Sequence, residues 1–365
     1  MSSDNKALCL FDFEDIKTLV ISRIDGNRGP LGVAKALIDQ FKLRSDYISR
    51  EYGGPFSLVR AIFAIPFRYE GHSICIHANG YKIPALLYFA SLIDMRNKYY
   101  CVMHGIARIE SSYRPIKQSV IILERFIFRH FSNIICVSDF QRQELFKLYG
   151  SRENVHIIGN GVDVSQFIGD EDDISYPLST KQVTAITTGG YESRKGTDLA
   201  IEVLVQLRRI CGINIKMIVC GRDGIEVGSN RELCEALAKD GGIDLEYFGE
   251  VEDKSNLIKL YKSCDFYFGL SRFDTFNVSV LEGAAARCIP VISNMCGAYN
   301  LFDVDSSVQC DIESKEWINI ATLKLARICN DSSRFKMMSL SAYQIASNSS
   351  WAQIAQQYCI LFEDK

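Results

Sequence analysis

The chain lacks several features that would place it across a membrane or outside the cell. No apolar run approaches the roughly 18 residues that a membrane-spanning helix needs. The N-terminus, MSSDNKALCLFDFEDI, is acidic and lacks the basic-then-apolar order of a secretory signal peptide. The 13 cysteines stand singly, and none has the C-x-x-C spacing of zinc or redox motifs. We therefore expect reduced thiols, no zinc module, no disulfide framework and a cytoplasmic location.

Two further absences narrow the function. The chain has no concentrated basic stripe, which argues against nucleic-acid binding. Its net charge is −3, with a slight excess of Lys and Arg up to Asp170 and an excess of Asp and Glu after it. A modestly basic first half is compatible with an anionic lipid surface. The dinucleotide fingerprint G-x-G-x-x-G is also missing from the first glycine-rich turn, which disfavours a dehydrogenase.

A strand, a polar loop, a helix and a second strand are predicted between Phe266 and Ser293 (FYFGLSRFDTFNVSVLEGAAARCIPVIS). This order is typical of a parallel α/β sheet, in which ligands bind beyond the carboxyl ends of the strands. Asp274 precedes the helix and Glu282 lies inside it, and either carboxylate can accept sugar hydroxyls. The backbone N–H groups of Phe276, Asn277 and Val278 are candidates for holding a phosphate at the start of the helix. The alternative for Glu282 is a surface ion pair.

A second strand-to-helix turn, Gly189 to Gly196, follows a predicted strand at Val183–Thr188 and precedes a predicted helix at Thr197–Ile210. Lys195, with Arg194 beside it, is placed next to the free N–H groups of that helix. The positive charge of a lysine beside the positive end of a helix dipole suits the binding of a diphosphate. A solvated Lys-Arg pair is the alternative. The turn is not a P-loop, because Gly follows the lysine and no Ser or Thr is placed for magnesium.

In the first half, a glycine-rich turn from Asp25 to Gly32 separates a predicted strand at Lys17–Ile24 from a predicted helix at Val33–Phe41. Glycine allows a close backbone approach to a ligand, so Gly29 and Gly32 are candidate contacts. A plain tight turn is the alternative.

Two histidines end predicted strands in this half, His77 at Ser73–His77 and His104 at Tyr99–His104. His104 is followed by Gly105 and is the stronger candidate for a functional role, because it is placed at the ligand-binding edge of a sheet. His77 is the weaker candidate. A structural role is the alternative for both, and we expect the other three histidines to be structural.

Together these motifs resemble the retaining glycosyltransferases of family 4, which have the GT-B fold. The resemblance rests on the acid pair Asp274 and Glu282, Lys195-Gly196, His104-Gly105, the strand followed by Asn160-Gly-Val-Asp163, and the last helix after Ser350-Trp351. It covers nearly all residues from about 17 to the end. The sequence departs from the family pattern at Asp274, where Glu is usual, at Thr275 and Asn277, where Gly is usual, and at Gly190, where Arg is usual.

The resemblance implies an α/β protein with two Rossmann-like domains that face each other across a cleft. The expected division is an acceptor-binding domain at 1–170, a nucleotide-sugar-binding domain at 171–345 and a C-terminal helix at 346–365 that crosses back to the first domain. The acidic, polar stretch Ile168–Lys181 is the expected linker. A helix at Arg114–Phe131 is expected to pack on the sheet, with docking on lipid as the alternative.

The resemblance also implies roles for individual residues. Catalytic roles fall to His104, Lys195 and Asp274. Contacts to the donor or its nucleotide fall to a larger set: Gly29, Gly32, Gly190, Arg194, Lys195, Gly249, Phe276, Asn277, Val278 and Glu282. No metal ligand is expected, and we interpret the D-x-D at Asp303-Val304-Asp305 as a chance occurrence in a polar, surface-like stretch.

The implied function is metal-independent transfer of a hexose, with retention of configuration, from a UDP- or GDP-linked donor. No cofactor is expected beyond this substrate. The expected acceptor is a glycan or lipid-linked saccharide in bacterial surface polysaccharide synthesis, such as O-antigen, capsule or lipopolysaccharide, at the cytoplasmic face of the inner membrane. Two alternatives remain, namely an inactive partner subunit with this fold, and a nucleotide-sugar epimerase or phosphorylase.

Overall fold

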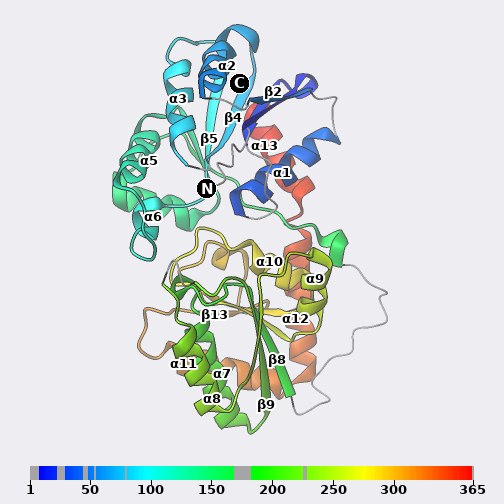
Figure 1. Ribbon diagram of the computed structural model, residues 1–365. Helices are drawn as coiled ribbons and strands as arrows, with labels where there is room; N and C mark the ends of the chain where they lie inside the picture. The colour runs from blue at the N-terminus through cyan, green and yellow to red at the C-terminus, as the bar shows by residue number, and fades with distance from the viewer. Residues whose placement is uncertain are drawn as a thin grey trace. The chain divides into compact units, whose positions relative to one another are not determined.

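The computed structural model describes residues 8–22, 29–43, 48–52, 55–78, 80–167, 182–224 and 228–363. The chain divides into two compact units, each built around its own sheet (Figure 1). The first comprises Met1–Glu110, Ile116–Gly161 and Trp351–Lys365, and the second comprises Ser111–Pro115 and Val162–Ser350. The predicted linker at 168–181 lies outside the described residues, as do residues 23–28 of the glycine-rich turn.

The sheet of the first unit has the strand order β3-β1-β2-β4-β5-β6-β7. Its strands are β1 (Leu8–Phe13), β2 (Thr18–Ser22), β3 (Ile48–Tyr52), β4 (Ser73–Ala78), β5 (Lys98–Met103), β6 (Asn133–Cys136) and β7 (Val155–Ile157). β1 runs antiparallel to β2 and β3, and the strands from β2 to β7 are parallel. The central strands are buried along almost their whole length, which explains their nearly continuous apolar sequence.

Helices cover both faces of this sheet (Figure 1). They are α1 (Gly29–Lys42), α2 (Pro55–Arg68), α3 (Lys82–Ser91), α4 (Ala107–Glu110), α5 (Gln118–His130), α6 (Asp139–Tyr149) and α13 (Trp351–Glu363). α1 and α13 pack together, and α2, α3 and α5 form a second group. Ser138 caps α6 by accepting a hydrogen bond from the N–H of Gln141 at 3.0 Å.

The sheet of the second unit is entirely parallel, with the order β10-β9-β8-β11-β12-β13. Its strands are β8 (Gln182–Thr187), β9 (Asn214–Cys220), β10 (Asp244–Gly249), β11 (Phe266–Gly269), β12 (Ile289–Ser293) and β13 (Val308–Cys310). The chain begins in the middle of the sheet, moves to one edge and then continues on the other side. The strand order therefore reverses between β8 and β11, and such a switch point is where open α/β sheets bind ligands.

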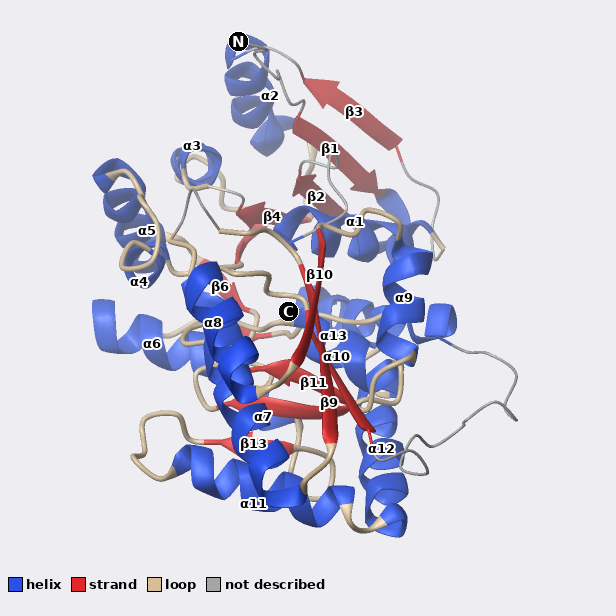
Figure 2. Cartoon of the chain, turned by 60° about the horizontal axis from the view of Figure 1, so that its bottom comes forward, coloured by secondary structure: helices blue, strands red, loops and turns tan. Residues whose placement is uncertain are grey.

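The helices of the second unit also lie on both faces (Figure 2). They are α7 (Thr197–Cys211), α8 (Arg231–Gly241), α9 (Lys254–Lys262), α10 (Val278–Ala285), α11 (Trp317–Cys329) and α12 (Ser332–Ser347). α7 packs against α8 and α11, whereas α10 packs against α12. α7 buries Ile201, Leu204 and Leu207 on one side and is followed by Gly212, whose φ of +63° suits glycine.

The predicted α/β architecture is confirmed, with corrections to individual elements. The sequence pattern did not identify β1, β3 or β13, nor helices such as α2, α3 and α8. It also placed the start of the first helix at Val33, whereas α1 begins at Gly29. Gly29 and Gly32 therefore lie in the first turn of a helix, where the intervening proline is tolerated, and not in a loop before it.

Candidate active site

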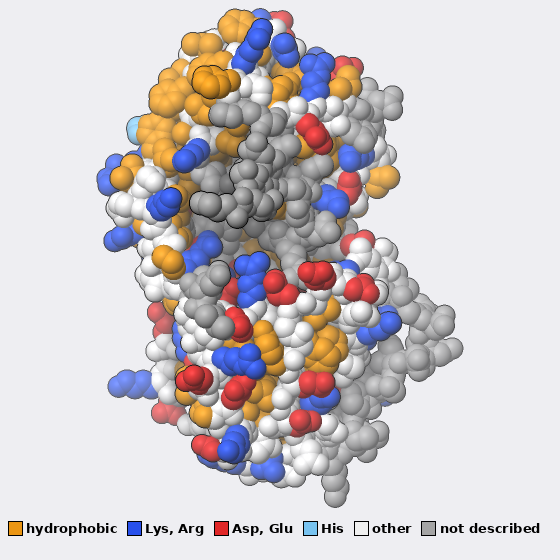
Figure 3. All heavy atoms as spheres, in the orientation of Figure 1, with side chains coloured by type: hydrophobic (Ala, Val, Ile, Leu, Met, Phe, Trp, Pro, Cys, Tyr) orange, Lys and Arg blue, Asp and Glu red, His pale blue; other side chains and the backbone are white. Residues whose placement is uncertain are grey.

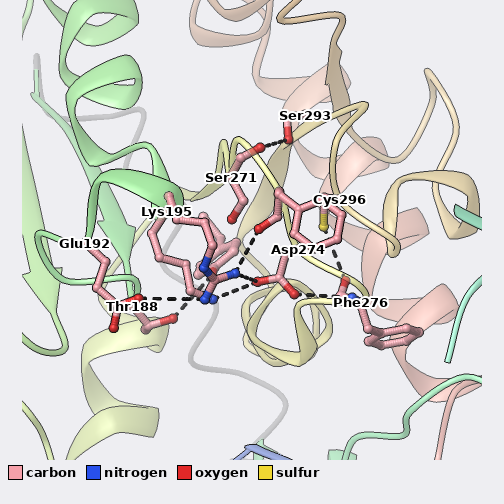
Figure 4. A network of polar contacts seen from close by, with 11 residues as sticks. Thr188, Glu192, Lys195, Ser271, Asp274, Phe276, Ser293 and Cys296 are labelled. Atoms are coloured by element: carbon pink, nitrogen blue, oxygen red, sulfur yellow. Dashed lines mark hydrogen bonds and ion pairs between the residues drawn. The ribbon is translucent and has the colours of Figure 1, made fainter. Parts of the chain in front are cut away.

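Two loops meet in the second unit at the carboxyl ends of neighbouring parallel strands. Because β8 pairs with β11, the loop at 188–196 and the loop at 270–277 leave the sheet side by side. The backbone N–H of Arg272 donates to the carbonyl of Arg194 at 2.8 Å and joins the two loops directly. Figure 4 shows the result, with the side chain of Lys195 directed at Asp274.

The carboxylate of Asp274 lies at the centre of this cluster and is only 9% exposed. Lys195 Nζ donates to its Oδ2 at 2.7 Å, and Arg194 Nη1 lies 3.6 Å from the same oxygen. Burial acts to raise the pKa of Asp274, but the two cations and the hydrogen bonds outweigh it and hold the pKa below its usual value. Asp274 is therefore ionised at neutral pH, and its carboxylate interacts with two positively charged side chains.

Glycines on both sides set the position of Lys195. The residue ends a short 3-10 helix, Ser193–Lys195, and is followed by Gly196 with φ of +71°. A Cβ on Gly196 would lie 1.9 Å from the carbonyl oxygen of Leu270, so only glycine lets the two loops touch there. A Cβ on Gly189 would lie 2.4 Å from the Cβ of Lys195. The lysine side chain therefore packs directly over the backbone of the preceding turn.

Gly190 explains one departure from the family pattern. Its φ is +59°, and a Cβ there would lie 1.9 Å from the carbonyl oxygen of Arg222. The backbone leaves no space for the arginine that is usual at this position. Arg194 instead brings a guanidinium to the cluster and donates to the carbonyl of Phe273 at 2.8 Å. It also lies 3.7 Å from the carboxylate of Glu192.

An ion pair behind the cluster fixes both loops. Arg272 Nη1 donates to Asp198 Oδ1 at 2.9 Å, Nη2 donates to Oδ2 at 2.5 Å, and Nη1 also reaches the carbonyl of Ser193 at 2.7 Å. The pair is bidentate, and the carboxylate is largely buried. The guanidinium of Arg272 thus connects the loop after β11 to the 3-10 helix and to the first turn of α7.

The start of α10 follows the cluster. Asn277 precedes the helix with φ of +67°, a left-handed conformation that glycine and asparagine adopt most readily. This explains why glycine is usual there and why asparagine replaces it. The N–H of Phe276 donates to Asp274 Oδ1 at 3.2 Å, so this group already has an acceptor. Val278 begins the helix.

Glu282 lies inside α10 and is part of a separate polar contact. Lys254 Nζ donates to its Oε1, and the hydroxyl of Tyr261 donates to Oε2 at 3.0 Å. Lys254 and Tyr261 both belong to α9, and the Tyr261 side chain is buried. The carboxylate of Glu282 is thereby held in one orientation. Gly249, at the end of β10, has φ of +65° and accepts a hydrogen bond from the N–H of Gly221 at 2.7 Å.

The structure gives the D-x-D sequence a turn role. Asp303 accepts hydrogen bonds from the backbone N–H of Asp305 at 3.1 Å and from the hydroxyl of Ser306 at 2.7 Å. In the described part of the chain, no three His, Cys, Asp or Glu side chains gather in a way that suits a metal ion.

In the first unit, the two predicted histidines contact each other. His77 lies in β4 and His104 directly follows β5. The separation between His77 Nδ1 and His104 Nε2 is 3.0 Å. Both pKa values are lowered by burial, that of His104 to about 4. Both rings are therefore neutral at pH 7.

Two family models together match the chain from residue 29 to residue 310. The model "Glycosyltransferase Family 4" matches residues 29–166, and the model "Glycosyl transferases group 1" matches residues 169–310. The chain belongs to the group 1 glycosyltransferases of the family 4 type. The acid pair and Lys195 of this glycosyltransferase both lie in the segment that the second model matches.

The three relatives described next share 22% identity or less with this glycosyltransferase. The D-inositol 3-phosphate glycosyltransferase of Corynebacterium kroppenstedtii is 22% identical over 277 residues, which are 72% of this chain and 60% of that protein. HepE (Alr3699) of Anabaena, solved with UDP and glucose, has a TM-score of 0.65 and 17% identity, covering 85% of this chain and 82% of its own. WaaG, a glycosyltransferase involved in lipopolysaccharide biosynthesis, has a TM-score of 0.56 and 14% identity, with coverages of 86% and 97%. These likenesses establish the GT-B fold.

Several residues of the site were not predicted from the sequence. Asp198, Lys254 and Tyr261 lie on helices and carry no local signal of function. Their roles arise only where a second element brings Arg272 or Glu282 against them. The sequence shows Asp198 as an acidic residue at the start of a predicted helix, but its partner Arg272 lies 74 positions away.

Proposed function

We propose that this glycosyltransferase moves a hexose from a UDP- or GDP-linked donor to a glycan or lipid-linked acceptor with retention of configuration. The observation that carries the proposal is the cluster of Lys195, Arg194 and Asp274 at the switch point of the second sheet. Two cations and one carboxylate match the two ends of a nucleotide sugar, which are an anionic diphosphate and a hydroxylated sugar.

The chemical difficulty of the reaction is the negative charge that grows on the nucleoside diphosphate as the glycosidic bond breaks. In our proposal, Lys195 and Arg194 stabilise that charge without magnesium, helped by the N–H groups at the starts of α7 and α10. Asp274 accepts hydrogen bonds from sugar hydroxyls and holds the Lys195 side chain in position before the donor binds. Glu282 accepts the ribose hydroxyls, with its carboxylate already oriented by Tyr261.

The donor and acceptor classes are part of the same proposal. HepE was solved with UDP and glucose, which favours a UDP-linked hexose among the candidates. The part that WaaG has in lipopolysaccharide biosynthesis supports a saccharide acceptor in surface polysaccharide synthesis. None of the 13 cysteines, which all lie in described parts of the chain, forms a disulfide, and this is compatible with the reducing cytoplasm as the place of action.

A thermal-shift panel of UDP, GDP, CDP and ADP sugars, each with and without magnesium, tests the donor site. A ligand at a hundred times its dissociation constant stabilises the protein by about 2.7 kcal/mol. We expect one sugar nucleotide to raise the melting temperature without magnesium. The shift should be lost in Glu282→Gln and kept in Glu235→Gln, which removes a matched but exposed ion pair with Arg231.

Analysis of the products formed from the sugar nucleotide that binds, with and without an acceptor, separates the alternatives. Nucleotide binding followed by release of the sugar to an acceptor supports the transferase. Conversion of the donor without an acceptor points to an epimerase. No shift with any donor, or binding without turnover, points to an inactive partner subunit and contradicts the proposal.

We also propose that the first unit contacts a membrane surface through α2 and α3. None of the described helices combines the length and apolarity that a membrane span requires. However, the two helices and the turn after α3 expose large apolar side chains, which Figure 3 shows gathered on the upper part of the molecule. They are Phe56, Val59, Phe63, Phe67, Phe89, Leu92, Ile93 and Met95.

The composition of α2 suits an anionic lipid surface. Phe56, Phe63 and Phe67 follow the helical repeat, while Ile62 and Ile65 on the opposite side are buried. The charged side chains of α2 are arginines, and it contains no acidic residue. α5, the helix for which lipid contact was the alternative, instead buries Ile121, Ile127 and Phe128 in the unit.

A further inference from the structure

His77 and His104 form a pair at the carboxyl ends of β4 and β5. β4 and β5 are parallel neighbours, with His77 opposite Val102 in the register. The ring centroids are 5.2 Å apart, the planes are inclined by 20°, and His77 Nδ1 lies 3.0 Å from His104 Nε2. His77 is 5% exposed, so water does not compete for this hydrogen bond. Only one of the two facing nitrogens can carry the proton of this hydrogen bond, so the tautomers of the two rings are coupled.

Two arrangements of neutral rings satisfy a hydrogen bond at this distance. In one, His77 Nδ1–H donates to His104 Nε2, and His104 then carries its own proton on Nδ1. In the other, His104 Nε2–H donates to His77 Nδ1, and His77 then carries its proton on Nε2. The two arrangements differ in what they leave at the far nitrogen of the buried His77 ring.

The surroundings of His77 Nε2 distinguish the two. This atom is buried and has no hydrogen-bond partner among the described residues. The ring of Tyr358 from α13 packs against the His77 ring, with centroids 6.4 Å apart. A buried N–H without an acceptor is rarer in proteins than a buried acceptor without a donor. The buried surroundings of the His77 ring therefore favour the first arrangement.

We propose that His77 is a positioning residue that donates from Nδ1–H to His104 Nε2 and thereby fixes His104 as the Nδ1–H tautomer. The backbone around His104 is already immobilised, since Gln141 Nε2 donates to the carbonyl of Met103 at 3.0 Å and the Tyr81 hydroxyl donates to that of Gly105 at 3.3 Å. His77 then determines the last variable of the imidazole, which is the nitrogen that bears the proton.

The consequence for sugar transfer rests on the proposed function, but the tautomer itself does not. With its proton on Nδ1 and a pKa lowered to about 4 by burial, His104 is a neutral hydrogen-bond donor at pH 7. Its Nε2 accepts the hydrogen bond from His77, so His104 cannot remove a proton through that nitrogen. In the proposed function, His104 therefore does not act as a general base through Nε2.

The test is the ¹⁵N chemical shift of the histidine side chains in the full-length protein labelled with ¹⁵N-histidine. Only five histidines are present, so single substitutions assign them. We expect His104 to show a protonated Nδ1 and an unprotonated Nε2 at pH 7.5, and His77 to show the same. A protonated Nε2 on His104, or rapid averaging between both forms, would overturn the proposal. This measurement needs neither a substrate nor a variant.

A variant then tests the cause. Free neutral imidazole favours the Nε2–H form, so removal of the donor in His77→Phe should shift His104 to a protonated Nε2, whereas His130→Phe should leave it unchanged. If His104 keeps its Nδ1 proton in a folded His77→Phe protein, His77 does not set the tautomer and the proposal fails. In a transfer assay, we expect kcat to fall about tenfold in His77→Phe, with a similar donor KM. If the wild type shows the Nδ1–H form of His104 but no transfer activity, the proposed function is rejected and the proposal about the tautomer still holds.

Discussion

At Lys195, one ammonium group has two roles that a substitution would separate. It neutralises Asp274 in the structure, and in the proposed function it stabilises the diphosphate. Lys195→Ala should reduce transfer about a hundredfold or more, because a preorganised charge contact is lost. It should also lower the free energy of unfolding by about 2 kcal/mol, because the more distant Arg194 is then the cation that remains beside the buried Asp274. Denaturation and transfer assays measure the two effects.

A second substitution and a control complete this test. Lys195→Ala combined with Asp274→Asn should recover most of the lost stability, since no carboxylate remains to be neutralised, and it should recover no activity. Lys216→Ala removes an exposed pair with Glu246 and should change either quantity little. Full activity in Lys195→Ala would contradict the assignment.

Gly190 is predicted to be a structural requirement and not an accidental loss of the family arginine. Gly212→Ala should cost only about 1 kcal/mol, because its left-handed backbone is strained but a Cβ there meets nothing within 4 Å. Gly190→Ala should cost at least about 2 kcal/mol more, since its Cβ would also collide with the backbone of Arg222. Urea denaturation of both variants gives the comparison, and equal losses would show that the collision is relieved at little cost.

Asp265 should make the stability depend on pH. It is 2% exposed, and burial raises its pKa to about 6, although the N–H of Thr184 donates to it at 2.8 Å. Between about pH 4 and pH 6 the folded state retains a proton that the unfolded state has lost. The wild type therefore loses stability as the pH rises through 6, by about 3 kcal/mol in total.

Asp265→Asn cannot ionise and should lack this loss. The difference in unfolding free energy between Asp265→Asn and the wild type should therefore move by about 2 kcal/mol in favour of the variant between pH 4.5 and pH 7.5, since the rest of the loss occurs below pH 4.5. Urea denaturation across this range measures it. A difference that does not change with pH would mean that Asp265 ionises normally.

At the scale of an element, α2 and α3 expose a group of large apolar side chains, which is unusual for a surface that contacts only water. Monomeric proteins rarely expose contiguous apolar patches of this kind without a partner. Sedimentation with vesicles of phosphatidylethanolamine and phosphatidylglycerol should show binding, and vesicles of phosphatidylcholine alone should bind less. Replacing Phe56 and Phe67 by Ser should weaken binding at least about tenfold, because each ring contributes on the order of 2 kcal/mol when buried.

The control for this prediction uses the other unit. Leu233 and Leu340 are exposed singly on α8 and α12, at 50% and 48%. Replacing both by Ser should leave vesicle binding unchanged. If both double variants bind as the wild type does, the α2 and α3 surface is not a lipid contact.

At the scale of the whole molecule, the C-terminal helix stabilises the unit in which the chain begins. Phe362 of α13 is 9% exposed and packs on Tyr100 of β5, with ring centroids 5.0 Å apart, and its carbonyl accepts from the Ser73 hydroxyl. Phe362→Ala should lower the unfolding free energy of the first unit by about 3 kcal/mol or more. Ile360→Ala, on the exposed side of the same helix, should change it by less than about 0.5 kcal/mol.

Hydrogen exchange identifies the unit that is affected. Amides of β4 and β5 should lose protection in Phe362→Ala, while those of β8 and β11 in the second unit should keep theirs. Loss of protection in both units would mean that they unfold together.

The sequence predicted the parallel strands and the loops that follow them, because these depend on local patterns. Apolar runs bounded by glycine mark buried strands, and the carboxyl end of such a strand is the ligand-binding edge whatever the neighbours are. These patterns selected Lys195 and Asp274, which the structure brings into contact, and their roles in catalysis stay predictions. The antiparallel strands β1 and β3 were missed, since Leu8–Phe13 lies in an acidic N-terminal stretch with no α-helix directly after it and Ile48–Tyr52 lies at an exposed edge with no clear alternation.

Only the tertiary structure decided which of these residues act on one another. Asp198 and Arg272 are 74 positions apart, and His77 and His104 are 27 apart, so their contacts depend on strand order and register. The backbone of Arg222 excludes a side chain at Gly190. The exposure of the apolar side chains of α2 likewise depends on how the other elements of the first unit pack. The sequence by itself determined the family and the fold, because periodicity and turn chemistry are local. The charges, tautomers and glycines of the site were decided by packing, because such contacts exist only once distant segments have come together.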